Sequence, residues 1–306
     1  MTGDRLVADI GGTNSRLGLA RAGQLNTASV ENFRNDDFAS FDDVLVRYLS
    51  DREDAQIADA VIAVAGPVHS RRACLTNRDW HFDETQLSRS LGGRPVSLLN
   101  DLAALGQASV FLGLDSLDPV VSLDESPMDE AQALVVGIGT GFNVSPVVIS
   151  KGRVAQLDVE YGHICLPADI ATELSARFGA HASGFTTIEE VFSGRGYAAL
   201  YALEQARTAP EPDRDTALQT RVKQEFQFFY AGLLAVLTRN LMLAFLPRRG
   251  IFFAGGVARN LLSTPAKAAF VDIVQGPFAL NAVGAVPVHN ILDDAAALKG
   301  CAVYAR

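Results

Sequence analysis

The sequence predicts an α/β fold made of two halves, each opened by a strand, a glycine turn and a second strand. The first half opens with RLVADIGGTNSRLGLA at 5–20, and the second with ALVVGIGTGFNVSPVVIS at 133–150. Further apolar runs, ADAVIAVAG and PVSLLN, end in turn residues and are separated by segments of helical periodicity. Strands mixed with helices indicate α/β layers. Two such halves would form two lobes that face a cleft, an arrangement that suits a nucleotide.

Composition narrows the class of protein. The chain has 306 residues, of which 48% are hydrophobic and 20% charged, as expected for a compact protein with a sizeable core. Its length allows one large domain or two ordinary ones. The formal net charge of -9 disfavours nucleic acid or an anionic membrane surface as the main partner.

Location follows from three further features of the sequence. The N-terminus lacks the basic-then-apolar layout of a signal peptide. The most apolar later stretch, 231–247, contains Arg239 and Asn240, so a buried helix is favoured over a membrane span. The three cysteines form no C-x-x-C pair, which argues against a disulfide framework or a zinc site. A reduced cytoplasm is therefore the expected location.

Helix signals lie between the expected strands. At 41–50 the apolar residues recur at i, i+3, i+4 and i+7, which predicts one buried stripe of a helix. Asp83 is a candidate N-cap for the next helix, and Gly92 a candidate stop. A long helix is expected from about Asp215 to Phe245. Its core-facing residues would be Phe226, Tyr230, Leu233, Leu237 and Leu241.

The first glycine turn, DIGGTN, places Asp9 before Gly11 and Gly12. Glycine tolerates positive φ, so this turn can direct backbone N–H groups toward one point and attract phosphate oxygens. Thr13 and Asn14 add polar side chains at the same rim. Asp9 could then hold Mg²⁺, which prefers oxygen ligands. The alternative is an ordinary hairpin, because short glycine motifs recur by chance.

Two later glycine turns can also be interpreted either as parts of a nucleotide site or as ordinary turns. In GIGTG, Gly137, Gly139 and Gly141 clear side chains from a turn and Thr140 offers a hydroxyl to a phosphate. In AGGVARN, Gly255 and Gly256 between a strand and a helix would let an adenine or a ribose approach the backbone. The alternatives are a hairpin and a tight βα turn.

Polar residues at three other turns are candidate substrate ligands. Asn100 and Asp101 end a strand and start a helix; Asp101 could accept a proton from a substrate hydroxyl, or both could act as helix caps. Glu160 and His163 flank Gly162 and could hold a polyol, although a structural histidine is the alternative. Glu189 and Glu190 precede Ser193-Gly194, where acidic residues also suit a solvated first turn of a helix.

The order of these motifs is more specific than any one of them. DIGGTNSRLGL, LTNRDW, LLNDLAAL, GIGTGF, EYGH, EEVFSGRG and FFAGGVARNLL follow one another across nearly the whole chain. Together they resemble the bacterial glucokinase family. This resemblance implies the two-lobed, actin-like (ribonuclease H-like) ATPase fold with a cleft between lobes. We expect a small lobe at 1–110 plus 291–306 and a large lobe at 111–290.

The resemblance also implies a role for each matching residue. Asp101 matches the catalytic base and Asn100 lies beside it on the sugar. Glu160, His163 and Glu189 match sugar-hydroxyl ligands. The first phosphate loop corresponds to Asp9, Gly11, Gly12, Thr13 and Asn14. The second phosphate loop corresponds to Gly137, Gly139, Thr140 and Gly141, and the adenosine turn to Gly255 and Gly256.

Transfer of a phosphoryl group from ATP, with Mg²⁺, to the 6-hydroxyl of glucose is the activity that the resemblance implies. A homodimer is expected on the same ground. Two alternatives stay open: a kinase of another hexose or amino sugar, and a sugar- or nucleotide-binding paralogue without turnover. Val159, Tyr161 and Asn143 depart from the family pattern. We expect Tyr161 to narrow the sugar pocket and Asn143 to crowd the nucleotide.

Overall fold

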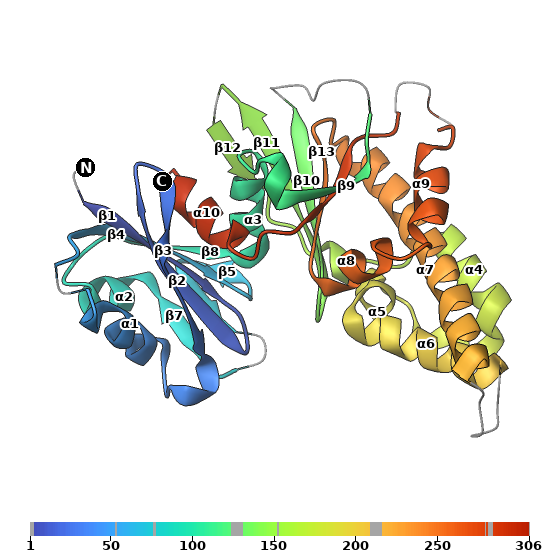
Figure 1. Cartoon of the computed structure of the whole chain (residues 1–306), viewed down its shortest axis with the longest axis horizontal. Helices are drawn as coiled ribbons and strands as arrows, with labels where there is room; N and C mark the ends of the chain where they lie inside the picture. The colour runs from blue at the N-terminus through green and yellow to red at the C-terminus, as the bar shows by residue number, and fades with distance from the viewer. Residues whose placement is uncertain are drawn as a thin grey trace. The chain divides into compact units, whose positions relative to one another are not determined.

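The computed structural model describes residues 3–52, 54–75, 78–123, 131–151, 153–208, 216–278, 280 and 284–305. The chain forms two compact units, each treated by itself below (Figure 1). The first unit comprises Met1–Gly113 and Asp293–Arg306, and the second comprises Leu114–Leu292. Each unit combines a mixed sheet with helices, so the predicted α/β class is confirmed. The cleft between lobes stays a prediction.

The first unit is built on a five-stranded sheet of order β3-β2-β1-β4-β8. Its strands are β1 (Asp4–Ile10), β2 (Asn14–Arg21), β3 (Gln24–Arg34), β4 (Ile57–Val64) and β8 (Val96–Asn100). A second, three-stranded sheet holds β5 (Val68–His69), β6 (Arg72–Cys74) and β7 (His81–Asp83). The helices are α1 (Phe41–Ser50), α2 (Glu84–Ser90), α3 (Asp101–Ser109) and α10 (Ala296–Val303).

Alternation along β1 separates two cores on the two faces of this sheet. Leu6, Ala8 and Ile10 join the core that includes α1, whereas Val7 joins the core that includes α10. The C-terminal helix α10 lies beside α3 (Figure 1). Gly300 allows this contact, because a Cβ there would collide with the carbonyl oxygen of Ala104. The two ends of the chain therefore complete one unit.

The second unit is built on a six-stranded sheet of order β12-β11-β10-β13-β14-β9. Its strands are β9 (Leu117–Val121), β10 (Gln132–Ile138), β11 (Phe142–Ser150), β12 (Arg153–Gln156), β13 (Gly250–Ala254) and β14 (Val288–Ile291). Its helices are α4 (Ala168–Phe178), α5 (Ile188–Phe192), α6 (Gly194–Thr208), α7 (Thr216–Phe245), α8 (Gly256–Leu262) and α9 (Lys267–Gln275).

The two sheets repeat one pairing pattern. In the first unit β1 pairs antiparallel with β2 and parallel with β4, and in the second unit β10 pairs antiparallel with β11 and parallel with β13. The two glycine turns occupy the same place in this pattern, between the strands of each opening hairpin. The similarity between DIGGTNSRLGL and GIGTGFNVSPV is therefore a similarity of structure as well as of sequence.

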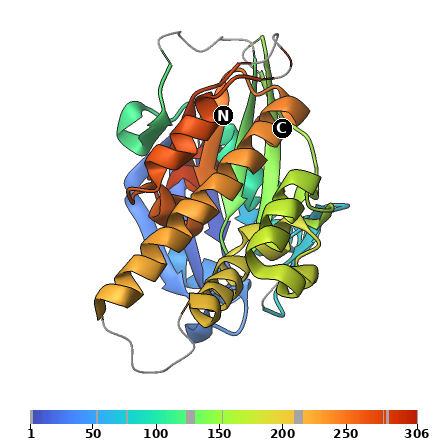
Figure 2. The same ribbon diagram turned by 90° about the vertical axis from the view of Figure 1, so that its right-hand side faces the viewer.

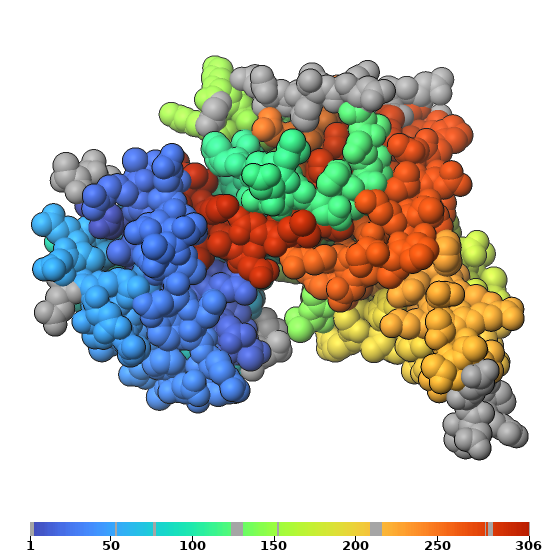
Figure 3. Space-filling view, viewed as in Figure 1, coloured from blue at the N-terminus to red at the C-terminus, as the bar shows by residue number. Residues whose placement is uncertain are grey.

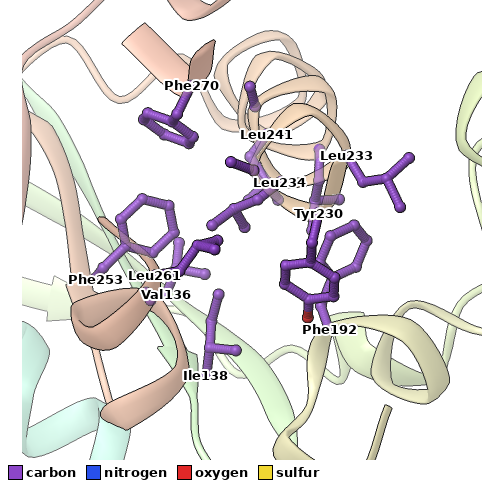
Figure 4. Close-up of a cluster of buried hydrophobic side chains, with 14 of the residues drawn as sticks. Val136, Ile138, Phe192, Tyr230, Leu233, Leu234, Leu241, Phe253, Leu261 and Phe270 are labelled. Atoms are coloured by element: carbon purple, nitrogen blue, oxygen red, sulfur yellow. The ribbon is translucent and has the colours of Figure 1, made fainter. Parts of the chain in front are cut away.

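Helix α7 forms the centre of the second core. Tyr230, Leu233, Leu234 and Leu241 of α7 lie close to Phe192, Phe253 and Phe270 from other elements (Figure 4). Helix α9 runs beside α7 (Figure 2), and its outer side forms part of the surface (Figure 3). Among the described helices only α7 is long and apolar enough to cross a membrane, but half of its most apolar window is buried inside the protein. This burial is typical of a core helix.

The sequence signals for helices are confirmed. Helix α1 buries Phe41, Val44, Leu45 and Tyr48. Asp83 caps α2 by accepting from the N–H groups of Thr85 and Gln86, and Gly92 follows the helix with φ of 65°. The five residues predicted to face the core from α7 are all buried. Asp215, where this helix was expected to begin, lies outside the described residues.

One buried carboxylate links α6 to α4 in the second unit, and its partner Arg177 also contacts α7. The Glu204 side chain on α6 is fully buried and accepts hydrogen bonds from Arg177 of α4 and from Arg207. Burial alone would raise the pKa of Glu204, but the hydrogen bonds from the two arginines lower it overall. The Arg177 guanidinium also lies 4.3 Å from the ring centroid of Phe229 on α7.

We expect Glu204→Gln to lower the free energy of unfolding by about 3 kcal/mol, because it leaves two arginines without their shared charge. Chemical denaturation at neutral pH measures this change. The control is Glu225→Gln, which removes an exposed i,i+4 partner of Arg221 and should change stability by less than about 0.5 kcal/mol. Equal effects of the two substitutions would contradict the prediction.

Candidate functional site

The first candidate site lies at one edge of the first sheet. Strands β1, β4 and β8 are parallel, so their carboxyl ends meet at the same edge. Asp9 is the penultimate residue of β1, Asn100 is the last residue of β8, and Asp101 begins α3. The strand order therefore brings together polar residues that are some 90 positions apart in the sequence.

Asn100 fixes the start of α3. Its Oδ1 accepts from the Leu102 N–H at 3.0 Å, and its Nδ2 donates to the Gly66 carbonyl at 3.0 Å. Asp101 Oδ1 accepts from the same Leu102 N–H at 2.9 Å. The capping interpretation is thus confirmed for Asn100. The cap also holds the Asp101 carboxylate in a defined orientation at the sheet edge.

The two acidic groups of this edge interact unfavourably. Burial, and then the negative charge of Asp9, raise the pKa of Asp101 from 3.8 to about 6. Burial also raises the pKa of Asp9, against the lowering effect of Arg16. The Arg16 Nη1 atom lies 4.0 Å from an Asp9 carboxylate oxygen, and the Asp9 side chain is 22% exposed. Asp101 is therefore a carboxylate with a proton affinity suited to proton transfer near neutral pH.

The first glycine turn is held by side chains that sequence analysis did not identify. The buried Asn35 donates to the Gly11 carbonyl at 2.8 Å and receives the Ser15 hydroxyl at 2.7 Å. Arg78 donates to the carbonyls of Gly12 and Asn35. Arg78 belongs to the LTNRDW motif, in which Thr76 and Asn77 lie outside the described residues. No local signal in the sequence links Asn35 or Arg78 to a turn 23 to 67 positions away.

The expected use of positive φ at Gly11 and Gly12 is wrong, and the glycines of the second phosphate turn do not use it either. None of the four glycines Gly11, Gly12, Gly139 and Gly141 has a positive φ. The Gly11 N–H instead donates to the Asn14 carbonyl at 2.9 Å, and the Gly139 N–H donates to the Gly141 carbonyl at 3.0 Å. Ordinary hairpin hydrogen bonding thus closes both turns. Thr13, Asn14 and Thr140 are exposed at their rims.

The second candidate site surrounds the turn at 138–142 in the second unit. Gly255 has φ of 99°, and a Cβ there would collide with the Ile138 carbonyl oxygen, so the AGG turn lies directly on this segment. The Gly194 N–H donates to the Gly139 carbonyl at 2.7 Å. A Cβ on Gly162 would collide with the Phe142 carbonyl oxygen. Three segments distant in sequence therefore converge on one turn.

Asn143 does not occupy the place that was expected for it. Its Nδ2 donates to the Val159 carbonyl at 2.9 Å and to Glu160 Oε2 at 3.1 Å, and its Oδ1 accepts from the Tyr161 N–H at 3.0 Å. The side chain therefore orders the Glu160 segment instead of facing a nucleotide. Asn143 thus hydrogen-bonds the backbone of Val159 and Tyr161, the two residues that flank Glu160.

Tyr161 also differs from expectation. Its ring contacts Phe245 at the end of α7, with ring centroids 5.3 Å apart, and it packs against the second core. The ring thus faces the core and is not available to narrow a sugar pocket. Glu160 and His163 are exposed, so both side chains are accessible to a ligand.

Glu189 is held in place on both sides of its carboxylate. Oε2 accepts from the Phe142 N–H at 3.0 Å and Oε1 accepts from Arg195 at 3.0 Å. Tyr230 of α7 supports the helix that carries it by donating to the Val191 carbonyl at 3.0 Å. Glu190, by contrast, forms a capping box with Thr187, as expected for a first-turn residue.

A cavity of about 780 Å³ adjoins the second turn. It is lined by the turn, by the AGG segment and by residues of α6, α7 and α8 that sequence analysis missed. The lining comprises Gly139, Thr140, Gly194, Arg195, Tyr197, Ala198, Lys223, Gln227, Gly256, Val257, Asn260 and Leu261. Lys223 and Gln227 are four residues apart, on one face of α7. Only the packing of α7 on α6 and α8 shows that this face borders the turn.

The described residues contain no group of three or more His, Cys, Asp and Glu side chains that could hold a metal ion. The three cysteines, all described, are free. A metal at Asp9 would therefore take most of its ligands from a bound substrate and from water, as Mg²⁺ commonly does.

Comparison with known proteins gives consistent matches. A family model described as Glucokinase matches residues 6–306. The glucokinase of Caulobacter vibrioides is 28% identical over 322 aligned residues, which cover 97% of this chain and 94% of the relative. A glucokinase crystal structure from an Antarctic psychrotroph has a TM-score of 0.82 at 27% identity and covers 99% of this chain and 98% of that one.

A more distant structure shares the fold. The glucokinase of Balamuthia mandrillaris in complex with glucose has a TM-score of 0.72 at 18% identity and covers 98% of this chain and 92% of that one. Taken together, the matches extend over both units of the chain.

We expect Asp101→Asn to raise the free energy of unfolding at pH 7, by at most about 3 kcal/mol, because the raised pKa makes the ionised carboxylate unfavourable in the folded state. Because the pKa of Asp101 is higher in the folded protein, its protonated carboxyl stabilises the fold. This stabilisation is fully present below about pH 3.8 and is lost as pH rises through about 6. Denaturation curves at pH 7 measure the change, and exposed Asp115→Asn serves as the unaffected control. A destabilised Asp101→Asn variant would contradict this prediction.

Proposed function

Because the chain belongs to the glucokinase family, we propose that it transfers the terminal phosphoryl group of ATP to a hydroxyl of glucose. The observation that carries the proposal is the placement of Asp101 at the carboxyl edge of the first sheet, where the Leu102 N–H holds its carboxylate and the nearby charge of Asp9 helps to raise its pKa. Proton transfer requires a carboxylate with a defined orientation and with a pKa near the operating pH, and Asp101 has both properties. Neither helix capping nor packing requires them.

In this proposal Asp101 is the general base. Its carboxylate takes the proton from the attacking sugar hydroxyl while that oxygen bonds to the terminal phosphorus and the bond from phosphorus to the ADP oxygen breaks. Such transfer asks the protein mainly for positioning and charge stabilisation. The proposed sugar ligands are Asn100, Glu160, His163 and Glu189. Hydrogen bonds to a charged acceptor contribute about 1.5–3 kcal/mol each, so several can select one pattern of hydroxyls.

The nucleotide is assigned to the glycine turns. The 780 Å³ cavity beside Gly139, Thr140 and Gly256 lies within the range of small-molecule sites, and Lys223 adds a positive charge to its wall. The second phosphate turn (Gly137, Gly139, Thr140, Gly141) would take the phosphates, and Gly255 and Gly256 the adenosine. The first turn, from Asp9 to Asn14, is assigned to the phosphates as well.

Asp9 fits the role of a Mg²⁺ ligand. Its carboxylate lies 4.0 Å from the nearest Arg16 nitrogen, beyond hydrogen-bond distance, and its negative charge raises the pKa of Asp101. A cation at Asp9 would relieve that repulsion, and oxygen donors suit Mg²⁺. When bound, the ion would neutralise charge on the phosphate oxygens. In this proposal Asp9 holds the metal ion, Asn100 and Asp101 orient the sugar, and Asp101 accepts the proton of the attacking hydroxyl.

The class of partner, the cellular location and the oligomeric state are also proposed. The net charge of -9 is consistent with a small-molecule substrate and disfavours nucleic acid as the main partner. Cytoplasmic location and a homodimer stay predictions.

The proposed activity is tested by ADP release with ATP, Mg²⁺ and a panel of hexoses and amino sugars. We expect glucose to give the highest kcat/KM, and Asp101→Asn to lower kcat by about 10²–10⁴, the usual contribution of a general base. Equilibrium glucose binding should survive in the variant. Exposed Asp115→Asn is the matched control. Full turnover by Asp101→Asn would remove the base assignment, and sugar binding without turnover in the unmodified protein would favour a non-catalytic paralogue.

The pH dependence of kcat/KM gives an independent check on Asp101. Activity should fall about tenfold per unit as pH drops below about 6, because the base is then protonated. In the metal-free protein, Asp9→Asn should lower the pKa of Asp101, since the charge of Asp9 contributes to the raised pKa. The pH dependence of the free energy of unfolding measures this change, and an unchanged dependence would show that another group titrates.

A further inference from the structure

We propose that Arg195 couples nucleotide binding to sugar binding by exchanging its partner, from the Glu189 carboxylate to the phosphates of the nucleotide. This inference rests on the proposed function, because it takes Glu189 as a sugar ligand and the cavity at Gly139 as the phosphate site. Neither the family resemblance nor the motif that contains Glu189 assigns a role to Arg195.

The first step concerns the position of Glu189. Its Oε2 accepts from the Phe142 N–H, and an added Cβ on Gly141 would lie only 2.7 Å from that oxygen. One side of the carboxylate is therefore fixed against the glycine turn. Gly162, in the segment that carries Glu160 and His163, approaches the Cβ of Glu189 as well. Glu189 thus lies at the junction of the proposed phosphate and sugar ligands of the second unit.

The second step concerns the other carboxylate oxygen. Oε1 accepts from Arg195 Nη2 at 3.0 Å, and Arg195 is the one basic side chain paired with Glu189 in the described part of the chain. The Glu189 side chain is 22% exposed, whereas that of Arg195 is 77% exposed. An ion pair with such an exposed partner contributes little to stability, so Arg195 can leave it at low cost.

The third step concerns what Arg195 faces. The residue lines the same 780 Å³ cavity as Gly139, Thr140 and Gly256. Phosphate groups offer a planar guanidinium bidentate acceptors and more negative charge than one carboxylate does. A nucleotide in this cavity would therefore compete successfully for Arg195.

The consequence is a link between the two ligands. When Arg195 turns to the phosphates, Glu189 Oε1 loses its charged donor and becomes a stronger acceptor for a sugar hydroxyl, while Phe142 still holds Oε2. In the absence of nucleotide, Arg195 occupies one of the acceptor positions of this oxygen and partly neutralises its charge. Coupling between two ligands is reciprocal, so glucose should tighten nucleotide binding by the same factor. Arg195 is thus a positioning residue, which acts through Glu189.

The test is equilibrium binding of glucose, by titration calorimetry, with and without a saturating non-hydrolysable ATP analogue. The unmodified protein should bind glucose about 5-fold to 50-fold more tightly with the analogue, within the usual range of coupling factors. Arg195→Met should bring this ratio close to one, and Arg195→Lys should restore part of it. Thermal unfolding should be unchanged in both variants, because the side chain is exposed.

The matched control is Lys223→Met. Lys223 lines the same cavity but belongs to α7, and the described structure records no contact between it and Glu189. This substitution should weaken nucleotide binding and leave the ratio measured at saturation unchanged. An unchanged ratio in Arg195→Met, or a ratio of one in the unmodified protein that binds both ligands, overturns the coupling alone. Failure of the unmodified protein to bind any hexose overturns the proposed function, and the coupling with it.

Discussion

Close backbone approach at one turn is the constraint on which the second unit depends. The segment 138–142 is met by Gly255, Gly194 and Gly162, which come from three regions spread over more than 90 residues. At Gly255 and Gly162 a Cβ would collide with a carbonyl oxygen of this segment. Because backbone touches backbone, these segments are positioned relative to one another without intervening flexible side chains. The turn between β10 and β11 therefore sets the geometry of every candidate ligand in the unit.

The first unit accepts an electrostatic cost at its candidate site. Asp9 and Asp101 are brought to one sheet edge by the parallel order of β1, β4 and β8, where burial and mutual repulsion disfavour their ionised forms. The buried carboxylate of Glu204 in the second unit shows the opposite solution, since two arginines neutralise it. A charge that is left without full compensation is typical of a functional position, whereas a compensated one serves the fold.

Two of the three departures from the family pattern have structural roles. Asn143 ties the Glu160 segment to β11, and Tyr161 packs on Phe245. Expectations based on the family pattern placed these side chains against ligands. The error has a simple reason: a sequence gives the position of a residue along the chain but not the direction of its side chain in an irregular segment, which only packing decides.

The sequence by itself determined the local elements. Helical periodicity indicated α1 and α7, and apolar runs on either side of the glycine turns indicated the opening strands. Capping chemistry indicated the starts of α2 and α3. These signals act between residues a few positions apart. Only the tertiary structure decided that Asn35 and Arg78 hold the first turn. It also decided that Arg195 both pairs with Glu189 and lines the cavity, and that the charge of Asp9 raises the pKa of Asp101. Those effects depend on distances between segments far apart in the chain, and such distances are set by the strand order and the packing of helices on the sheets.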